Sequence, residues 1–423
     1  MTPRKPPSAR GAAVALLDQV IGQGRMLSDS SGVLRDLKGS QRAEALRLAT
    51  DTLRGLERAD RLLSRVVRKK PPLHVRNALR LGTVELCLGG DAHGVVSDLV
   101  SHISTNNRYR HLKGLVNAVL RQMAEGAGRP WNDLRIPRMP RWLREPLAQA
   151  WGNGSVSAME AAHFKGAPLD VTAKSDSARV AEMLGGTLLP TGSIRLTDFG
   201  QVSAQPGFET GEWWVQDAAA AIPVRALNPS PGMRALDMCA APGGKTLQLA
   251  AAGAEVTAID TSERRMDRVR ENLERTNLSA ELVIENVLAF DKSGYDLVLL
   301  DAPCSATGTI RRHPDLPYAK DGSEFGELIA LQAKMLNHAV SLLAPGGRLM
   351  FCTCSLLPDE GEVQIEELLE RREDLQTEPT VFDNLGIEPE WLTEEGGLRL
   401  RPDYWSDLGG MDGFYMACVT QRT

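Results

Sequence analysis

The sequence predicts an all-helical bundle at the N-terminal end, followed by an α/β domain with a mainly parallel, doubly wound sheet. Two observations predict this combination. Apolar residues recur at intervals of three and four within residues 10–125, which is the spacing of amphipathic helices. From about residue 231, short apolar runs alternate with helical patterns, as in a parallel sheet with crossover helices. The 423 residues exceed one typical core, so several domains are expected.

The helical part is built from apolar faces at 13–21 and 112–123, with arginine-rich helical stretches between them. Lys69-Lys70-Pro71-Pro72 breaks the helical pattern, because proline does not continue a helix. A Gly/Pro-rich passage then predicts a linker, and mixed signals follow it. The expected segments are a helical domain at 1–125, a linker at 126–140, a mixed α/β subdomain at 141–205 and an α/β domain at 206–423.

The α/β domain shows short strand patterns separated by helical ones. Two further strands near the C-terminus are expected to extend the same sheet. The expected strands are 234–239, 255–260, 281–286, 296–302, 347–353, 397–401 and 413–420, and the expected helices are 245–252, 262–276 and 326–343.

Charge is distributed unevenly along the chain. Residues 1–150 hold 26 Lys and Arg against 13 Asp and Glu, a charge of +13. The remaining residues hold 23 against 41, a charge of −18, which leaves the net −5 of the whole chain. A basic domain beside an acidic one favours binding of a polyanion such as RNA by the N-terminal part, although solvated basic helix faces are the simpler alternative.

The six cysteines are scattered, which is typical of a reducing cytoplasm and not of a disulfide framework. The basic N-terminus lacks the apolar segment of a secretory signal, and no apolar run is long enough to span a bilayer. We therefore expect a cytoplasmic protein without membrane partners, acting as a monomer.

A glycine turn follows the first strand of the α/β domain, where Asp237 to Thr246 reads DMCAAPGGKT. Such a turn brings the backbone close to a ligand, and its small residues leave room for a bulky group. The next strand ends in Asp260, whose carboxylate could accept both ribose hydroxyls of an adenosine, and Asn286 ends the third strand near the adenine edge. The simpler alternative is ordinary turn chemistry with Asp260 as a helix cap.

Two later strands end in cysteine motifs, at Asp301-Ala-Pro-Cys304 and at Cys352-Thr-Cys354. Ligands of parallel sheets bind beyond the carboxyl ends of the strands, so these residues should meet in one site. A thiolate that adds to carbon 6 of a cytosine makes carbon 5 able to accept a methyl group. Asp301 could stabilise the charge that develops on the ring.

The remaining cysteines have simpler interpretations. Cys87, Cys239 and Cys418 fit buried packing, since a lone cysteine usually behaves as a small hydrophobe. Cys352 and Cys354 form a C-x-C pair without a second pair or a nearby histidine, so no metal site is expected.

These motifs resemble the RNA 5-methylcytosine methyltransferases of the Sun/RsmB type. The matching strings are DMCAAPGGKT, AIDTSERRMDRV, LLDAPCSATGTIRRHPD, CTCSLLPDEGE and DGFYMA, together with PGFETGEWWVQDAAA. The first 125 residues resemble a NusB-like RNA-binding bundle, most clearly in LKGLVNAVLRQM. The resemblance implies a Rossmann-like, S-adenosylmethionine-dependent methyltransferase domain whose substrate is 16S rRNA or a small-subunit precursor.

The resemblance also implies roles for particular residues. Cys354 would be the nucleophile, Cys304 would help to release the methylated product, and Asp301 would lie beside both ligands. Arg265 would support the Asp260 loop. The methyl donor would contact Cys239, Ala240, Ala241, Pro242, Gly243, Gly244, Lys245, Asp260, Arg265, Asn286 and Asp301.

Two positions depart from the family pattern. Asn286 stands where members usually have Asp, which would weaken or change the contact with the adenine amino group. Val171-Thr-Ala-Lys174 stands where members tend to read Leu-Arg-Val-Asn, in the mixed region expected to face RNA. A tRNA methyltransferase of the same chemistry and a non-catalytic ribosome assembly factor remain as alternatives.

Overall fold

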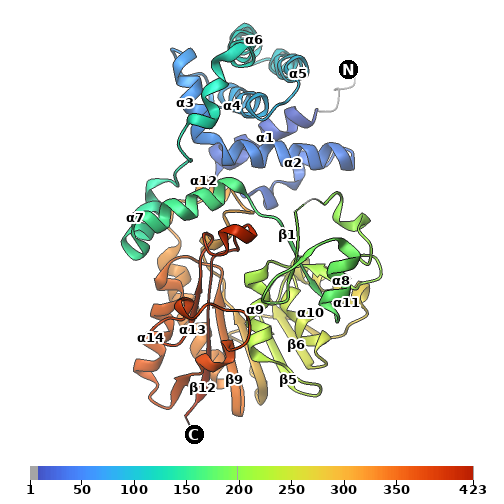
Figure 1. Cartoon of the computed structure of the whole chain (residues 1–423), viewed down its shortest axis with the longest axis vertical. Helices are drawn as coiled ribbons and strands as arrows, with labels where there is room; N and C mark the ends of the chain where they lie inside the picture. The colour runs from blue at the N-terminus through green and yellow to red at the C-terminus, as the bar shows by residue number, and fades with distance from the viewer. Residues whose placement is uncertain (1–7, 198, 423) are drawn as a thin grey trace. The chain divides into compact units, whose positions relative to one another are not determined.

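The computed structural model describes residues 8–197 and 199–422, and its contacts divide the chain into two compact units (Figure 1). The first unit comprises Met1–Gly166 and Ile310–Asp321, and the second comprises Ala167–Thr309 and Gly322–Thr423. The basic residues 1–7 lie outside the described residues. Among the described helices, none is long and apolar enough to cross a membrane.

Among the described residues of the first unit, every regular element is a helix, as the apolar periodicity predicts. The apolar faces of these helices meet in one core, to which the first six α-helices contribute buried Leu, Val and Ala side chains. Ser8 and Asp91 cap two of the helices by accepting hydrogen bonds from backbone N–H groups. The helices are α1 (Ala9–Gln23), α2 (Gly39–Arg54), α3 (Leu56–Val66), α4 (Leu73–Cys87), α5 (Ala92–Thr105), α6 (Lys113–Gln122), α7 (Arg141–Lys165) and α12 (Leu316–Ala319).

Residues 126–140, the expected linker, pack against the bundle. The short helical turns η4 (Met123–Ala127) and η5 (Arg129–Asp133) precede an extended stretch, and Trp131 is buried in the core. Arg58 donates hydrogen bonds to the carbonyl oxygens of Leu134 and Arg135. The segment therefore has fixed partners within the first unit.

Residues 310–321 join the same unit although they follow the Cys304 motif in sequence. The Asp315 carboxylate accepts from the Leu27 N–H at 2.7 Å, and the Arg54 guanidinium donates to the Arg311 carbonyl oxygen at 2.9 Å. The chain therefore passes between the two units three times, after Gly166, after Thr309 and after Asp321.

The second unit begins with a four-stranded antiparallel sheet in the order β2-β3-β1-β4. Asp170 and Arg195 form a buried ion pair of 2.7 Å across β1 and β3. The mixed pattern predicted at 141–205 thus divides: residues 141–165 form α7, and the strands start at Leu169. The elements are β1 (Leu169–Ala173), α8 (Ser177–Leu184), β2 (Thr187–Leu188), β3 (Ile194–Leu196) and β4 (Trp213–Val215).

The larger sheet has the order β10-β12-β9-β8-β5-β6-β7, with β11 paired to β12. Strands β9, β8, β5, β6 and β7 are parallel, as predicted. The two predicted C-terminal strands, β11 and β12, extend the same sheet, and their pairing is antiparallel. The strands are β5 (Arg234–Met238), β6 (Glu255–Asp260), β7 (Glu281–Ile284), β8 (Tyr295–Asp301), β9 (Leu343–Thr353), β10 (Leu375–Thr377), β11 (Leu398–Leu400) and β12 (Phe414–Gln421). The helices of this unit's larger sheet are α9 (Ala218–Leu227), α10 (Gly244–Ala251), α11 (Glu263–Thr276), α13 (Phe325–Ser341) and α14 (Glu362–Arg371).

Helices cover both faces of this sheet, because neighbouring residues of each strand point to opposite sides. Val298 and Leu300 of β8 share a core with α13 and α14, whereas Leu297 and Leu299 share a core with α9. The chain runs from β5 outward to β6 and β7, and then crosses back to β8 beside β5. The strand order therefore reverses between β5 and β8, which is where ligands of such sheets bind.

Candidate active site

The predicted site residues gather at the carboxyl ends of four neighbouring parallel strands. β5 ends at Met238, β6 at Asp260, β8 at Asp301 and β9 at Thr353. Asp301 and Cys352 are paired in register across β8 and β9. The turns that follow these strands carry Cys239, Cys304 and Cys354, so the topology brings the residues to one edge of the sheet.

Cys304 and Cys354 are in direct contact, with their Sγ atoms 3.5 Å apart. The Gly308 N–H donates to the Cys354 carbonyl oxygen at 2.9 Å, which joins the loop after β8 to the loop after β9. The pKa of the Cys304 thiol is raised well above its usual value by its hydrogen bond with Cys354, by burial and by nearby negative charge. At neutral pH, the Cys304 thiol is therefore protonated.

Lys245 and Asp301 form an ion pair of 2.7 Å at the centre of this edge. Burial of Lys245 would lower its pKa, but the Asp301 carboxylate outweighs that effect and the pKa of the ammonium is raised. The ammonium also lies over the Phe414 ring, 5.1 Å from its centre. From the sequence, Lys245 is expected to contact only the methyl donor. Lys245 is in addition a permanent cation beside Asp301, the carboxylate that is expected to face the cytosine.

The glycine turn between β5 and α10 has the shape of a ligand cradle. Cys239 and Gly243 have φ values of 63° and 103°, so the backbone turns sharply at both. The buried Asp260 accepts from the Ala241 N–H at 3.3 Å and from the Ser262 N–H at 2.9 Å. Each carboxylate oxygen keeps a lone pair, so Asp260 can still receive two hydroxyl groups. Arg265 lies 3.5 Å from Asp260.

Asp237 is a buried acid at the base of the same turn. Its Oδ2 accepts from the Thr246 hydroxyl at 2.6 Å, and its Oδ1 has no hydrogen-bond partner among the described residues. Burial raises the pKa of this carboxyl to about 7. An unpartnered, buried acceptor beside the cradle fits a ligand that carries a hydrogen-bond donor.

Asn286 lies beyond β7, which ends at Ile284 and not at residue 286 as predicted from the sequence. Strand pairing stops early because the following residues turn, and the Asn286 Oδ1 accepts from the Leu288 N–H at 3.1 Å. The side-chain amide oxygen of Asn286 therefore already accepts one hydrogen bond within this turn. Its exposed side chain keeps the amide NH₂ available.

The second departure from the family pattern has a structural explanation. Val171 and Thr172 are buried in β1, and the Lys174 ammonium donates to the Thr276 carbonyl oxygen at 2.6 Å. Thr276 is the last residue of α11, where carbonyl groups lack helical partners and a cation is favourable. These side chains therefore contact the interior of the second unit, and the expectation that this stretch faces RNA stays a prediction.

A buried carboxylate escaped the sequence interpretation. Glu360 is 0% exposed and lies beneath the two cysteine loops, where it accepts hydrogen bonds from Ser305, Ser355 and Gln332. The string CTCSLLPDEGE contains it, but nothing in the spacing distinguishes it from the neighbouring acids Asp359 and Glu362. In the fold Asp359 is exposed, Glu362 is buried in an ion pair with Arg399, and Glu360 is the acid that accepts hydrogen bonds from both cysteine loops.

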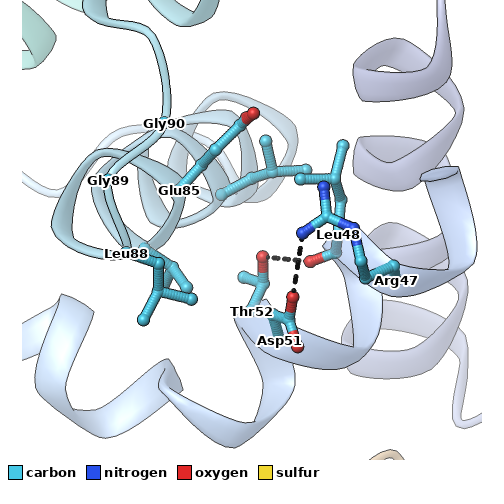
Figure 2. Close-up of a pocket in the computed structure, with 10 residues that line it drawn as sticks. Arg47, Leu48, Asp51, Thr52, Glu85, Leu88, Gly89 and Gly90 are labelled. Carbon is cyan, nitrogen blue, oxygen red and sulfur yellow. Dashed lines mark hydrogen bonds and ion pairs between the residues drawn. The ribbon is translucent and has the colours of Figure 1, made fainter. Parts of the chain in front are cut away.

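A hollow in the helical unit lies between α2 and α4 (Figure 2). Its charged groups already have partners: Arg47 pairs with Asp51 at 3.2 Å, and Glu85 pairs with Arg10 at 2.7 Å. The Thr52 hydroxyl donates to the Leu48 carbonyl oxygen. The hollow therefore offers little free polarity to a ligand.

Comparison with known proteins agrees with this geometry. Residues 224–420 match the family described as 16S rRNA methyltransferase RsmB/F, and residues 7–125 match the NusB family. The chain is 32% identical to the ribosomal RNA small subunit methyltransferase B of Erwinia tasmaniensis, over 99% of this chain and 100% of that protein. It is 34% identical to the protein of the same name from Klebsiella pneumoniae, over 88% and 91% of the two chains.

Solved structures resemble the fold as well. The structure named PH0851 has a TM-score of 0.74 and 20% identity, over 97% of this chain and 98% of its own. A methyltransferase homolog from Pyrococcus horikoshii has a TM-score of 0.55 and 28% identity, over 66% of this chain and 94% of its own. The family resemblance inferred from the motifs is confirmed. The chain therefore belongs to the RsmB/F family of 16S rRNA methyltransferases and carries a NusB-family domain at its N-terminal end.

Proposed function

We propose that Cys354 is the nucleophile with which this chain methylates carbon 5 of a cytosine in 16S rRNA. Its family makes it an S-adenosylmethionine-dependent rRNA cytosine-5 methyltransferase. The observation that carries the proposal is the contact between two thiols, 3.5 Å apart, at the point where the strand order reverses. Two adjacent cysteines at that point suit a covalent reaction in which one attacks and the other assists.

The reaction begins when the target cytosine leaves its stack. The Cys354 thiolate forms a bond to carbon 6, and carbon 5 becomes an enamine-like nucleophile. A bare carboxylate would repel the electron density that moves onto the ring, but Asp301 is neutralised by Lys245 at 2.7 Å. The pair can therefore lie beside the ring without adding net negative charge, and the Lys245 ammonium can offset the negative charge that develops toward nitrogen 3.

Product release reverses the attachment. S-adenosylmethionine supplies the methyl group that carbon 5 receives. A base then removes the proton from carbon 5, and the bond between carbon 6 and the Cys354 sulfur breaks with the electron pair returning to sulfur. Cys304, protonated and in contact with Cys354, is placed to give its proton to the departing thiolate.

The donor would occupy the turn between β5 and α10. Backbone groups of Cys239 to Lys245 would surround its methionine and adenosine parts, with Asp260 on the ribose hydroxyls. Arg265 would hold the Asp260 loop, because it also donates to the Ala241 carbonyl oxygen. Asn286 would approach the adenine through its free amide NH₂. No metal is required for this chemistry.

RNA would be held chiefly by the N-terminal unit, whose sequence to residue 150 carries the charge of +13 derived above. We further propose that the protein works in the cytoplasm as a monomer, on 16S rRNA or a small-subunit precursor. All six cysteines are free, which agrees with a reducing compartment.

A denaturing gel with labelled 16S rRNA and methyl donor tests the proposal. Wild type, Cys304→Ala, Cys354→Ala and the control Cys87→Ala, a half-buried cysteine of the helical unit, are compared. We expect a protein–RNA adduct to accumulate only with Cys304→Ala, no methylation with Cys354→Ala, and wild-type behaviour with Cys87→Ala. Methylation that persists in Cys354→Ala would refute the assigned nucleophile.

A further inference from the structure

The two cysteine loops are fastened to each other below the thiols by a buried network of hydrogen bonds. Glu360 lies at its centre, and its Oε1 accepts from the Ser305 N–H at 2.9 Å and from the Gln332 amide at 3.0 Å. Its Oε2 accepts from the Ser355 hydroxyl at 2.6 Å and from the Ser305 hydroxyl at 2.5 Å. Ser305 follows Cys304, and Ser355 follows Cys354.

Each donor belongs to a different part of the site. Ser305 lies in the loop after β8, Ser355 in the loop after β9, and Gln332 in α13. Gln332 also donates to the Pro303 carbonyl oxygen at 2.8 Å, directly before Cys304. Glu360, Ser305, Gln332 and Ser355 are all 0% exposed, so water does not compete for these bonds.

We propose that Glu360 is a positioning residue that fastens the Cys304 loop to the Cys354 loop and thereby sets the contact between the two thiols. This inference rests on the proposed function, because it assigns a use to the contact that the reaction requires. All four donors to this carboxylate lie within one residue of a cysteine or on the helix that holds Pro303.

The charge of Glu360 has a second consequence for the pair. Two thiols in contact lose one proton easily and the second with difficulty, because two adjacent thiolates repel each other. Negative charge at Glu360 raises the pKa of Cys304, after the larger contributions of Cys354 and burial. The other charged groups near the network are Lys245 with Asp301, and Arg399 with Glu362, of which Arg399 donates to the Ser355 carbonyl oxygen. Glu360 therefore favours the protonated form of Cys304.

Replacement by glutamine separates the shape of Glu360 from its charge. In Glu360→Gln, the amide oxygen can replace Oε1, and the amide NH₂ can donate to the two hydroxyls, which rotate to accept. The network then keeps its geometry but loses its charge. Glu360→Asp keeps the charge but shortens the side chain, and Glu160→Gln is a matched control. Glu160 is a buried glutamate of the helical unit that accepts from the Met139 N–H at 2.9 Å.

The first measurement is the pH profile of thiol alkylation of Cys304 in a Cys354→Ser background, without RNA or methyl donor. Glu360→Gln should shift the Cys304 profile to lower pH by about one unit, and Glu160→Gln should leave it unchanged. Circular dichroism and thermal unfolding establish that each variant is folded. An unshifted profile in folded Glu360→Gln would overturn the electrostatic part of the proposal.

The second measurement is turnover with the native cysteines. Glu360→Gln should lower kcat roughly tenfold or more with little change in KM for either substrate, and Glu360→Asp should recover part of the loss. Ser355→Ala, which removes one donor from the network, provides a second variant if Glu360→Gln does not fold, and it should also lower kcat. Wild-type kcat in both Glu360→Gln and Ser355→Ala would overturn the positioning role. A wild-type enzyme without activity or adduct would instead refute the proposed function, while the alkylation result would still stand.

Discussion

The Sγ atoms of Cys304 and Cys354 lie 3.5 Å apart, although 50 residues separate the two cysteines in sequence. Neither strand end could produce this contact alone. The parallel pairing of β8 with β9 brings the two loops to one edge, and backbone hydrogen bonds then join them. The distance between the thiols is consequently a property of the packing beneath them.

Gly308 is expected to be irreplaceable in the loop that carries Cys304. A Cβ atom at this position would lie 2.0 Å from the Gly413 carbonyl oxygen, a backbone atom that cannot move aside without shifting β12. Gly308→Ala should lower the free energy of unfolding by roughly 1–3 kcal/mol and abolish most methylation. Gly326→Ala is the control, because its Cβ meets nothing within 4 Å, and it should be neutral or slightly stabilising. Urea unfolding and turnover measure both variants, and a fully active Gly308→Ala would contradict the expected clash.

Lys245 is expected to matter through Asp301. Lys245→Met keeps the apolar length of the side chain but leaves the Asp301 carboxylate without its cation, so repulsion of the electron-rich ring should return. Single-turnover methylation should slow by roughly a hundredfold. The exposed Lys292, paired with Glu281 at 3.2 Å, provides the control Lys292→Met with unchanged rate. If Lys245→Met reacted at the wild-type rate, neutralisation of Asp301 would not contribute to the reaction.

Much of this fold could be predicted because its signals are local. Apolar spacing identified the helical bundle, and short apolar runs located β5, β6 and β8 within a residue or two. Asp301 and Cys354 followed from the rule that parallel strands end at one edge. The family motifs, such as DMCAAPGGKT, could also be identified from the single sequence, because each is a continuous string.

What escaped prediction depends on tertiary packing. The role of Lys174 at the end of α11 requires contact between residues separated by 102 positions, and no sequence pattern reports such a contact. Glu360 resembles any acid at the start of a helix until its hydrogen bonds to Ser305 and Ser355 distinguish it. The assignment of residues 310–321 to the helical unit likewise arises from hydrogen bonds such as that between Leu27 and Asp315.

Asp237 is expected to make stability fall as the pH rises toward neutrality. Its folded pKa of about 7 lies above the ordinary value of 3.8, so the neutral form is favoured in the folded protein. The resulting stabilisation is complete below about pH 4 and is lost as the pH rises through 7, on the order of 4 kcal/mol in total. Chemical unfolding of wild type and Asp237→Asn at pH 5 and pH 8 measures the difference. The free energies of the two proteins should diverge at pH 8, and a constant difference across this range would exclude a buried, titrating Asp237.

His163 is expected to make the helical unit labile to acid. It is buried in α7, neither ring nitrogen has a hydrogen-bond partner among the described residues, and burial together with the charge of Arg311 lowers its pKa to about 3. A base with a lowered folded pKa contributes stability that is complete above pH 6.5 and is lost as the pH falls toward 3. Hydrogen exchange of the α7 amides should therefore accelerate in wild type between pH 6.5 and 4, after correction for the intrinsic exchange rate. In His163→Leu this acceleration should be much smaller, whereas the exposed His93→Leu should behave as wild type. Equal pH dependence in His163→Leu and wild type would mean that another group causes the acid lability, since no other change separates the two proteins.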